Sequence, residues 1–502
     1  MADAGDREDR GVVSLIILGA NGDLARRKLI PALFSLHCKG RLPEHINIIG
    51  FSRTPFTDDE FRDSMWDSAV ELAEVDRPRE MYEEFAKRLC YVTGDLGDSE
   101  GISRLADRLD QLESTDRPIN RLFYLSIAPA LYAQAVEALG AAGLASEDSG
   151  WRRLVVEKPF GSDLNSALEL DLIVRRVFDE TQVFRIDHYL GKETVQNLMV
   201  LRFANSIFEP IWNQNYVKNI QITVAEEVDV GTRAGYYDRS GVIRDMLQNH
   251  LLQLLTIVAM EPPATVDAES LRNRKVDVLR SIRRLSPDDV LTETVAGQYD
   301  GYLDQDGVAE GSHTATYAAV RLFVDNWRWK GVPFYLRTGK AMERKVSEVV
   351  VEFQTPPHFI FADGVTNPDP PPNVLAICIQ PDEGARLRFQ VKVPDRGMEM
   401  RSATMEFHYE SEFSGQAIPE AYERLLQDAI KGDASLFIRG DQIEESWRIV
   451  DPINQAWESN DGSGPLRYAP GSMGPAAADA LLAQAGDKWL VGCGPHEDDP
   501  ET

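Results

Sequence analysis

The sequence predicts an α/β domain with a parallel, doubly wound sheet, followed by an α+β domain with a large, mainly antiparallel sheet. Apolar strand patterns alternate with helical patterns between residues 12 and 180, which is typical of a parallel sheet covered by helices on both faces. From about residue 311, strand patterns follow one another without helices between them, which indicates antiparallel pairing. We therefore expect two domains, residues 1–182 and residues 183–502.

The composition is that of a folded, acidic protein. Of the 502 residues, 43% are hydrophobic and 27% are charged, so the chain can bury extensive cores and is not expected to be disordered. The formal net charge is −28, from 81 acidic and 53 basic residues, which argues against a general nucleic-acid or membrane surface. A phosphate ligand would therefore need a local basic pocket.

The sequence contains no pattern typical of secretion, membrane insertion or metal binding. Met1–Arg10 is acidic and lacks an apolar signal core, and no apolar run reaches membrane-spanning length. Cys38, Cys90, Cys378 and Cys493 are widely spaced and form no metal-ligand or redox motif. We expect a soluble, cytoplasmic protein with structural thiols, although the spacing leaves a disulfide open.

The first strand leads directly into a glycine turn. Val12–Leu18 is almost continuously apolar and precedes Gly19–Ala25, after which leucines recur at helical spacing. Small residues in such a turn allow the backbone to approach a pyrophosphate at the helix N-terminus, although Ala25 replaces the third glycine of the usual pattern. The turn in this context predicts a Rossmann-like dinucleotide-binding domain. Its contacts would come from Gly19, Asn21, Gly22, Asp23 and Leu24.

A second buried strand, Asn47–Phe51, is followed closely by an arginine. At this position a dinucleotide enzyme distinguishes a ribose hydroxyl from a 2′-phosphate, and Arg53 in place of an acid favours NADP. The alternative is that Arg53 is an ordinary solvated surface residue.

Later strands of the first domain place further polar groups at the same edge of the sheet. Residues 58–90 are expected to form a charged outer helix, and strands are expected at Tyr91–Asp95, Arg121–Ile127 and Arg153–Val156. Lys158 comes directly after the last of these strands and before a proline, so we interpret it as a positioned ammonium. The alternative is a surface charge.

The stretch Arg185–Glu193 joins a strand to a helix and gathers four polar side chains, Asp187, His188, Tyr189 and Lys192. Backbone N–H groups at such a junction favour an anionic ligand, and the imidazole, phenol and ammonium would add three donors. The alternative is a polar loop with a surface lysine and a capping aspartate.

The second domain is expected to contain one strongly apolar helix and a series of strands. The helix begins near Ile243 and carries His250 on its apolar face, where a histidine is most often a hydrogen-bonded core residue. Helices are also expected at about 417–430 and 441–449. The expected strands are Asn219–Val224, Ala315–Phe323, Val332–Leu336, Ser347–Phe353, Asn373–Gln380, Ala385–Val393 and Met398–Tyr409.

Taken together, these segments resemble the glucose-6-phosphate dehydrogenase family. The stretch Arg185–Glu193 is very specific to that family, whereas the glycine turn and the Glu-Lys-Pro turn also occur in other dehydrogenases. The resemblance covers nearly the whole chain and rests on Gly19–Ala25, Glu157–Gly161, Arg185–Glu193, Arg244–His250, Leu336–Lys340, Ala421–Leu426 and Glu445–Ile449.

The resemblance implies an oxidoreductase that converts glucose 6-phosphate to 6-phosphogluconolactone with NADP, the first step of the pentose phosphate pathway. It implies that His250 is the base for the C1 hydroxyl and that Asp187 orients it. Matching positions imply sugar-phosphate contacts for His188, Tyr189 and Lys192. They also imply contacts that hold the sugar for Lys158, Glu226, Asp245 and Lys340, and Lys158 is expected near the cofactor as well.

Assembly and the second acceptor are further expectations. The broad antiparallel sheet could form a subunit surface, so we expect a homodimer or homotetramer through this sheet, and the net charge of −28 argues against a nucleic-acid partner. Some relatives accept NAD as well as NADP. Asn21 departs from the Ser or Thr that is usual in the family, and the segment after Lys340 is one residue shorter than in many relatives, so Arg344 is assigned no phosphate role.

Two other functions are consistent with parts of the sequence. A sugar dehydrogenase of the glucose–fructose oxidoreductase type shares the glycine turn and the Glu-Lys-Pro turn, but it gives no role to the polar cluster at 187–192. A catalytically silent NADP-binding regulatory protein would share the fold, but the presence of both Asp187 and His250 argues against it.

Overall fold

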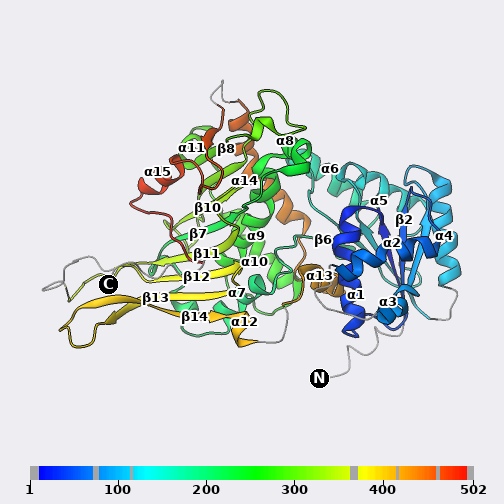
Figure 1. Cartoon of the computed structure of the whole chain (residues 1–502), viewed down its shortest axis with the longest axis horizontal. Coiled ribbons are helices and arrows are strands. Elements are labelled where there is room, and N and C mark those ends of the chain that lie inside the picture. Colours follow the sequence, from blue (N-terminus) through cyan, green and yellow to red (C-terminus); the bar gives the residue numbers. More distant parts are fainter. Residues whose placement is uncertain are drawn as a thin grey trace. The chain divides into compact units, whose positions relative to one another are not determined.

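The computed structural model describes residues 11–71, 79–113, 117–361, 371–413, 418–459 and 464–493 (Figure 1). The chain forms two compact units. The first unit comprises Met1–Gly191, Thr265–Arg272 and Pro419–Glu444, and the second comprises Lys192–Ala264, Asn273–Ile418 and Glu445–Thr502. The division after residue 182 remains a prediction about which residues fold as an independent domain.

The first unit is built on a six-stranded parallel sheet, as the alternating pattern predicts. The strand order β3-β2-β1-β4-β5-β6 reverses direction between β1 and β4, and at such a point a doubly wound sheet binds its ligand. Every residue of β1 is buried, which explains its continuous apolar pattern. The strands are β1 (Val12–Leu18), β2 (Ile46–Ser52), β3 (Leu89–Thr93), β4 (Ile119–Leu125), β5 (Arg152–Val156) and β6 (Val183–Arg185).

The helices of the first unit differ from the sequence prediction at one point. The prediction of a single helix over residues 58–90 is wrong, because the chain forms two helices there and enters β3 at Leu89. Residues 72–78 lie outside the described residues. The second of these helices buries Tyr82 and Phe85 against Phe34, so it is not a purely solvated helix. The helical segments are η2 (Ala25–Leu29), α1 (Ile30–Cys38), α2 (Asp58–Glu71), α3 (Arg79–Ala86), α4 (Ser99–Leu112), η3 (Pro129–Leu131), α5 (Tyr132–Ala141), α6 (Leu164–Arg175), η4 (Glu180–Gln182) and α13 (Ala421–Lys431).

Helix α13 comes from late in the chain and packs on α1 within the first unit (Figure 1). Lys39 forms an ion pair of 2.5 Å with Glu423. Arg153 of β5 donates hydrogen bonds to the carbonyl oxygens of Ala429 and Ile430, at 2.9 and 2.6 Å. A helix near residues 417–430 was expected, but its attachment to the parallel sheet was not.

The second unit contains a nine-stranded sheet in the order β14-β13-β12-β11-β7-β10-β9-β8-β15. All neighbouring strands are antiparallel except for the parallel pairs β7–β10 and β8–β15, so the expected mainly antiparallel sheet is confirmed. Two strands, β8 and β15, were missed. The strands are β7 (Val217–Ala225), β8 (Thr294–Tyr299), β9 (Tyr317–Phe323), β10 (Pro333–Gly339), β11 (Val346–Phe353), β12 (Val374–Gln380), β13 (Gly384–Lys392), β14 (Met400–His408) and β15 (Leu466–Tyr468).

Helices complete the second unit. They are α7 (Glu193–Phe203), η5 (Glu209–Ile211), η6 (Gly231–Arg233), α8 (Ala234–Val242), η7 (Ile243–Leu251), α9 (Leu252–Ala259), α11 (Pro287–Glu293), η8 (Tyr302–Asp304), α12 (Tyr409–Glu412) and α15 (Ala477–Ala483). Two longer helices, α10 (Ala268–Ser281) and α14 (Gly440–Ser459), contain residues of both units. Among the described residues, every helix is too short or too polar to span a lipid bilayer.

The cysteines differ from the expectation of structural thiols. Cys378 on β12 forms a disulfide with Cys493, across 115 residues of sequence. Cys38 and Cys90 are not disulfide-bonded and remain thiols, as expected.

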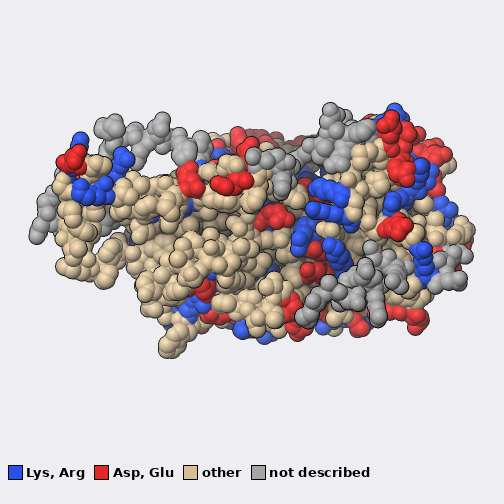
Figure 2. Space-filling view, turned by 90° about the horizontal axis from the view of Figure 1, so that it is seen from below, with Lys and Arg blue, Asp and Glu red and all other residues tan. Residues whose placement is uncertain are grey.

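Acidic and basic side chains are mixed on the face of the molecule that Figure 2 shows, and much of that face carries neither. The charges are therefore not segregated into one broad basic surface on this face. Basic groups that matter for an anionic ligand have to be sought in local clusters.

Candidate active site

The glycine turn lies at the switch point of the parallel sheet. Gly19 follows β1 with φ +90°, and a Cβ atom at this position would lie 2.2 Å from the carbonyl oxygen of Ser126, which follows β4. Only glycine fits this close approach without strain. The backbone N–H of Gly22 donates to the carbonyl of Gly19 at 2.9 Å and closes the turn in front of Ala25, which is fully buried. Asp23 is exposed in an ion pair with Arg27, and Leu24 is half-buried.

Two predicted cofactor-binding residues follow neighbouring strands: Asn21 lies in the glycine turn after β1, and Arg53, the predicted cofactor-selecting residue, directly follows β2. Asn21 donates to the hydroxyl of Tyr91 at 3.4 Å, and Ser52 shares a hydrogen bond of 2.9 Å with the same hydroxyl. The Oδ1 atom of Asn21 is buried and has no hydrogen-bond partner among the described residues. Arg53 is exposed, and no described residue forms an ion pair with it. The Oδ1 atom of Asn21 and the guanidinium of Arg53 are therefore two polar groups that no described residue satisfies.

Lys158 is half-buried after β5, next to a network that the sequence did not reveal. The carboxylate of Glu157 accepts hydrogen bonds from Tyr124 at 2.6 Å and from Tyr422 of α13 at 3.0 Å. Burial raises the pKa of the Glu157 carboxyl, while the two hydroxyls and the charge of Lys158 oppose the rise. Helix α13 thereby helps to fix the turn that carries Lys158.

The predicted stretch after β6 is largely buried. Asp187 is completely buried, and its Oδ1 atom accepts a hydrogen bond from the backbone N–H of Tyr189 at 3.0 Å. His188 is half-buried, with its ring centroid 5.0 Å from that of Tyr189. A buried carboxylate that begins a tight turn is not the solvated capping residue of the alternative interpretation.

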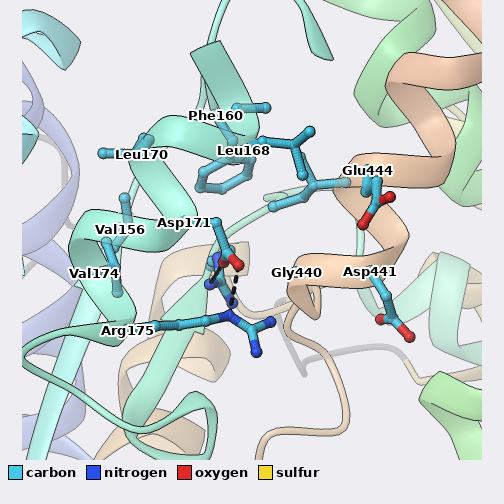
Figure 3. Close-up of a pocket in the computed structure, with 13 residues that line it drawn as sticks. Val156, Phe160, Leu168, Leu170, Asp171, Val174, Arg175, Gly440, Asp441 and Glu444 are labelled. Carbon is cyan, nitrogen blue, oxygen red and sulfur yellow. Dashed lines mark hydrogen bonds and ion pairs between the residues drawn. The ribbon is translucent and has the colours of Figure 1, made fainter. Parts of the chain in front are cut away.

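A small cavity lies beside this stretch in the first unit (Figure 3). Its volume is about 80 Å³, and Phe160, Leu168 and Val174 form its apolar wall. Asp171 points toward Arg175 and pairs with it at 2.5 Å, and it also pairs with the buried Arg185 at 2.6 Å. Small-molecule sites usually have volumes of roughly 300–1,000 Å³, so this cavity is too small for a sugar phosphate. The ion pair between Asp171 and Arg185 instead fixes the end of β6, two residues before Asp187.

In the second unit, the sheet brings Glu226 and Lys340 together. The parallel strands β7 and β10 pair with Ala225 opposite Gly339, so the residues that follow each strand are neighbours. Lys340 forms an ion pair with Glu226, and its ammonium lies 5.6 Å from the ring centroid of Tyr237. These two predicted residues are separated by more than a hundred positions in sequence, and strand pairing alone unites them.

The predicted base lies on a π-helix. Segment η7 packs against β7 and β10 and carries Asp245 and His250, both buried. Because a π-helix bonds residue i to residue i+5, these two residues are one turn apart, which an α-helix would not allow. The side chain of Asn249 accepts a hydrogen bond from the backbone N–H of His250 at 2.7 Å and donates one to the carbonyl of Arg244 at 3.2 Å.

Tyr237 and Gln380 are two neighbours of predicted residues that the sequence reasoning missed. Tyr237 is buried, and desolvation together with the charges of Asp245 and Glu226 holds its pKa well above the ordinary value, so it remains a neutral phenol. Gln380 at the end of β12 accepts a hydrogen bond from Lys192, which lies directly before α7 rather than in its first turn. No motif marks Gln380; only its position at a strand end, before a proline, could have drawn attention to it.

Two family models match nearly the whole chain. The model described as "Glucose-6-phosphate dehydrogenase, NAD binding domain" matches residues 16–197. The model described as "Glucose-6-phosphate dehydrogenase, C-terminal domain" matches residues 199–490.

Curated proteins and solved structures agree with these models. Glucose-6-phosphate 1-dehydrogenase of Aggregatibacter actinomycetemcomitans is 46% identical over 486 residues, which cover 95% of this chain and 96% of that protein. Glucose-6-phosphate 1-dehydrogenase 2 of Mycobacterium bovis is 41% identical over 492 residues, which cover 95% and 94%. A structure of glucose-6-phosphate dehydrogenase in complex with its substrate glucose-6-phosphate has a TM-score of 0.88 at 34% identity, over 96% of this chain and 99% of that chain. Glucose-6-phosphate 1-dehydrogenase from Mycobacterium avium has a TM-score of 0.82 at 38% identity, over 96% and 100%.

Proposed function

The chain belongs to the glucose-6-phosphate dehydrogenase family, and we propose that it oxidises glucose 6-phosphate at C1 to 6-phosphogluconolactone with NADP as the acceptor. The observation that carries this function is the match of both family-domain models, over residues 16–197 and 199–490. The chain is thus an oxidoreductase with a nicotinamide dinucleotide cofactor.

His250 is the proposed base. Oxidation of an alcohol requires removal of the hydroxyl proton, and a positioned imidazole is well suited to this step. The buried carboxylate of Asp187 would orient the ring and stabilise its protonated form. A nicotinamide dinucleotide held at the glycine turn would supply the hydride acceptor. The pairing of Asp187 with His250 remains a prediction. It would give a buried histidine a catalytic role rather than a purely structural one.

The remaining predicted residues would bind the substrate. His188, Tyr189 and Lys192 would bind the sugar phosphate, because an imidazole, a phenol and an ammonium are all donors to phosphate oxygens. Lys158, Glu226, Asp245 and Lys340 would hold the sugar ring. The ion pair between Glu226 and Lys340 supports this role, since it presents an acceptor and a donor side by side for vicinal hydroxyl groups.

An activity assay tests this function directly. Formation of NADPH is followed by absorbance with glucose 6-phosphate and, separately, with free glucose. We expect kcat/KM for the phosphate ester to exceed that for glucose by about 100- to 10,000-fold, since each charged hydrogen bond contributes roughly 1.5–3 kcal/mol. Equal or greater activity on free glucose would contradict the proposal and favour a sugar dehydrogenase of another type. A protein that binds NADP without turnover would favour the regulatory alternative.

The preference for NADP is proposed from Arg53. Its exposed guanidinium, with no acidic partner among the described residues, supports an ion pair with a 2′-phosphate. We expect Arg53→Ala to raise KM for NADP by about 10- to 100-fold and to change KM for NAD by less than about threefold. Arg41→Ala, at another arginine of the first unit, serves as the control and should change neither. Equal losses for both cofactors would remove the argument for NADP.

Assembly and location complete the proposal. We propose a cytoplasmic homodimer or homotetramer in which the nine-stranded sheet forms the subunit contact. The exposed positions of β13 and β14 support such a contact, because exposed apolar side chains such as Met405 on a sheet are available to pack against a second copy. Measurement of the mass in solution decides between these assemblies and a monomer.

A further inference from the structure

The C-terminal segment, residues 487–493, lies on the nine-stranded sheet and covers buried polar groups. Gln221 of β7 donates to the carbonyl of Lys488 at 2.9 Å and accepts from the N–H of Leu490 at 2.8 Å. Glu348 of β11 accepts from the N–H of Cys493 at 2.8 Å. Gln221 and Glu348 are each 1% exposed, so the backbone of this segment replaces the water that these side chains would otherwise require.

The same segment packs tightly against two strands. A Cβ atom on Gly492 would lie 2.6 Å from the Cβ of Ala376 and 2.8 Å from a methyl group of Val350. No larger residue fits there without displacing the segment. The disulfide between Cys378 and Cys493 then fixes its end to β12, with both cysteines 1% exposed.

Strand β12 also reaches the predicted phosphate-binding residues. Two positions after Cys378, Gln380 accepts a hydrogen bond from Lys192 and donates one to the hydroxyl of Ser347 at 3.0 Å. Between them, the carbonyl of Ile379 accepts a hydrogen bond from Thr194 of α7 at 3.2 Å. The end of β12 therefore positions the start of α7. The disulfide at Cys378 lies two residues before Gln380, which contacts Lys192.

We propose that the Cys378–Cys493 disulfide is a redox-sensitive clamp that holds the C-terminal segment on the sheet and, through Gln380, positions Lys192 for the substrate phosphate. The second half of this proposal rests on the proposed function; the first half does not. The redox sensitivity rests on the proposed cytoplasmic location, because disulfides in a reducing compartment are commonly redox-responsive rather than permanent.

Opening of the clamp is a two-electron exchange with a dithiol. A thiolate of the dithiol attacks one sulfur, a mixed disulfide forms, and the second thiol of the reagent resolves it. The protein gains two S–H groups, the S–S bond breaks, and the dithiol becomes a cyclic disulfide. Because both protein sulfurs are buried, attack requires residues 487–493 to lift from the sheet first.

The experiment uses the full-length protein before and after treatment with dithiothreitol. Thiol counting should find two free thiols before reduction and four after it. Amide hydrogen exchange at residues 488–493 should accelerate by at least about tenfold on reduction, since local opening controls exchange. KM for glucose 6-phosphate should rise by about three- to tenfold with kcat changed less than twofold, the pattern of weakened substrate binding.

Three variants separate the clamp from other effects of reduction. Cys493→Ala should reproduce the reduced state without dithiothreitol. Gly492→Val keeps both cysteines but displaces the segment, so its disulfide should be reduced faster than that of the wild type. Cys38→Ala removes a thiol of the first unit that is not disulfide-bonded, and this variant should respond to reduction as the wild type does.

Each result decides one half of the proposal. Four free thiols in the untreated protein, or unchanged exchange at 488–493 after reduction, would overturn the clamp whatever the activity of the chain. Faster exchange with an unchanged KM for glucose 6-phosphate would overturn the connection to Lys192 and leave the clamp standing. Absence of glucose 6-phosphate oxidation in the untreated wild type would instead overturn the proposed function.

Discussion

His250→Asn is expected to lower kcat by about 100- to 10,000-fold, the usual contribution of a positioned general base. Asparagine retains a polar side chain of smaller volume but cannot accept a proton at neutral pH. KM for glucose 6-phosphate should change less than about threefold, because the base acts in the transition state rather than in binding. Steady-state kinetics with NADP give both values.

The control for this variant is His313→Asn, the same change at an exposed histidine of the second unit. It should leave kcat and KM unchanged. Circular dichroism and thermal unfolding of both variants establish that they are folded. Wild-type kcat in folded His250→Asn would show that His250 is a core residue, as its apolar surroundings alone suggest.

Arg202→Met is expected to lower the free energy of unfolding by about 3–5 kcal/mol, the cost of breaking a buried, hydrogen-bonded charge network. Arg202 is completely buried and donates to the carbonyls of Ile257, Val258 and Met260 at 2.8–2.9 Å. It also pairs with Glu209 at 3.2 Å. Burial lowers the pKa of its guanidinium to about 10, so it stays charged at neutral pH.

The substitution should also disturb the site. The carbonyls of Ile257, Val258 and Met260 lie at the end of α9, and α9 continues directly from η7, which carries His250. The C-terminal carbonyls of a helix need partners, and methionine offers none. Urea unfolding followed by tryptophan fluorescence is a suitable measurement, because Trp212 donates to the carbonyl of Val258 in the same cluster. Arg274→Met, at a partly exposed ion pair, should change stability by less than about 0.5 kcal/mol. A similarly small effect of Arg202→Met on the free energy of unfolding would show that the hydrogen bonds from Arg202 to the end of α9 do not stabilise the protein.

Local patterns predicted much of the fold because they reflect burial directly. β1 is apolar except for Ser14 because every residue of it is buried. The glycine turn after it was recognisable because a side chain at Gly19 would collide with Ser126. β8 and β15 were missed because they lack a clear apolar pattern. β8 contains a glycine and partly exposed positions, and β15 has only three residues.

The site was predicted less from patterns than from resemblance. Among leucines, His250 carries no local signal of catalysis, and Glu226 and Lys340 are unremarkable as separate residues. Family motifs identified them, and the structure places Glu226 and Lys340 together through the parallel pairing of β7 and β10. Their roles in binding and catalysis remain predictions.

The sequence by itself determined the alternating layers of the first unit, the series of strands in the second and the family of the chain, because each depends on residues close together in sequence. Tertiary structure alone decided the order of the strands, the attachment of α13 to the parallel sheet and the disulfide between Cys378 and Cys493. The attachment of α13 and the disulfide join residues more than a hundred positions apart, and each strand order includes such a pair, β1 with β4 and β7 with β10. Between residues so far apart, long-range packing rather than local propensity selects the partner.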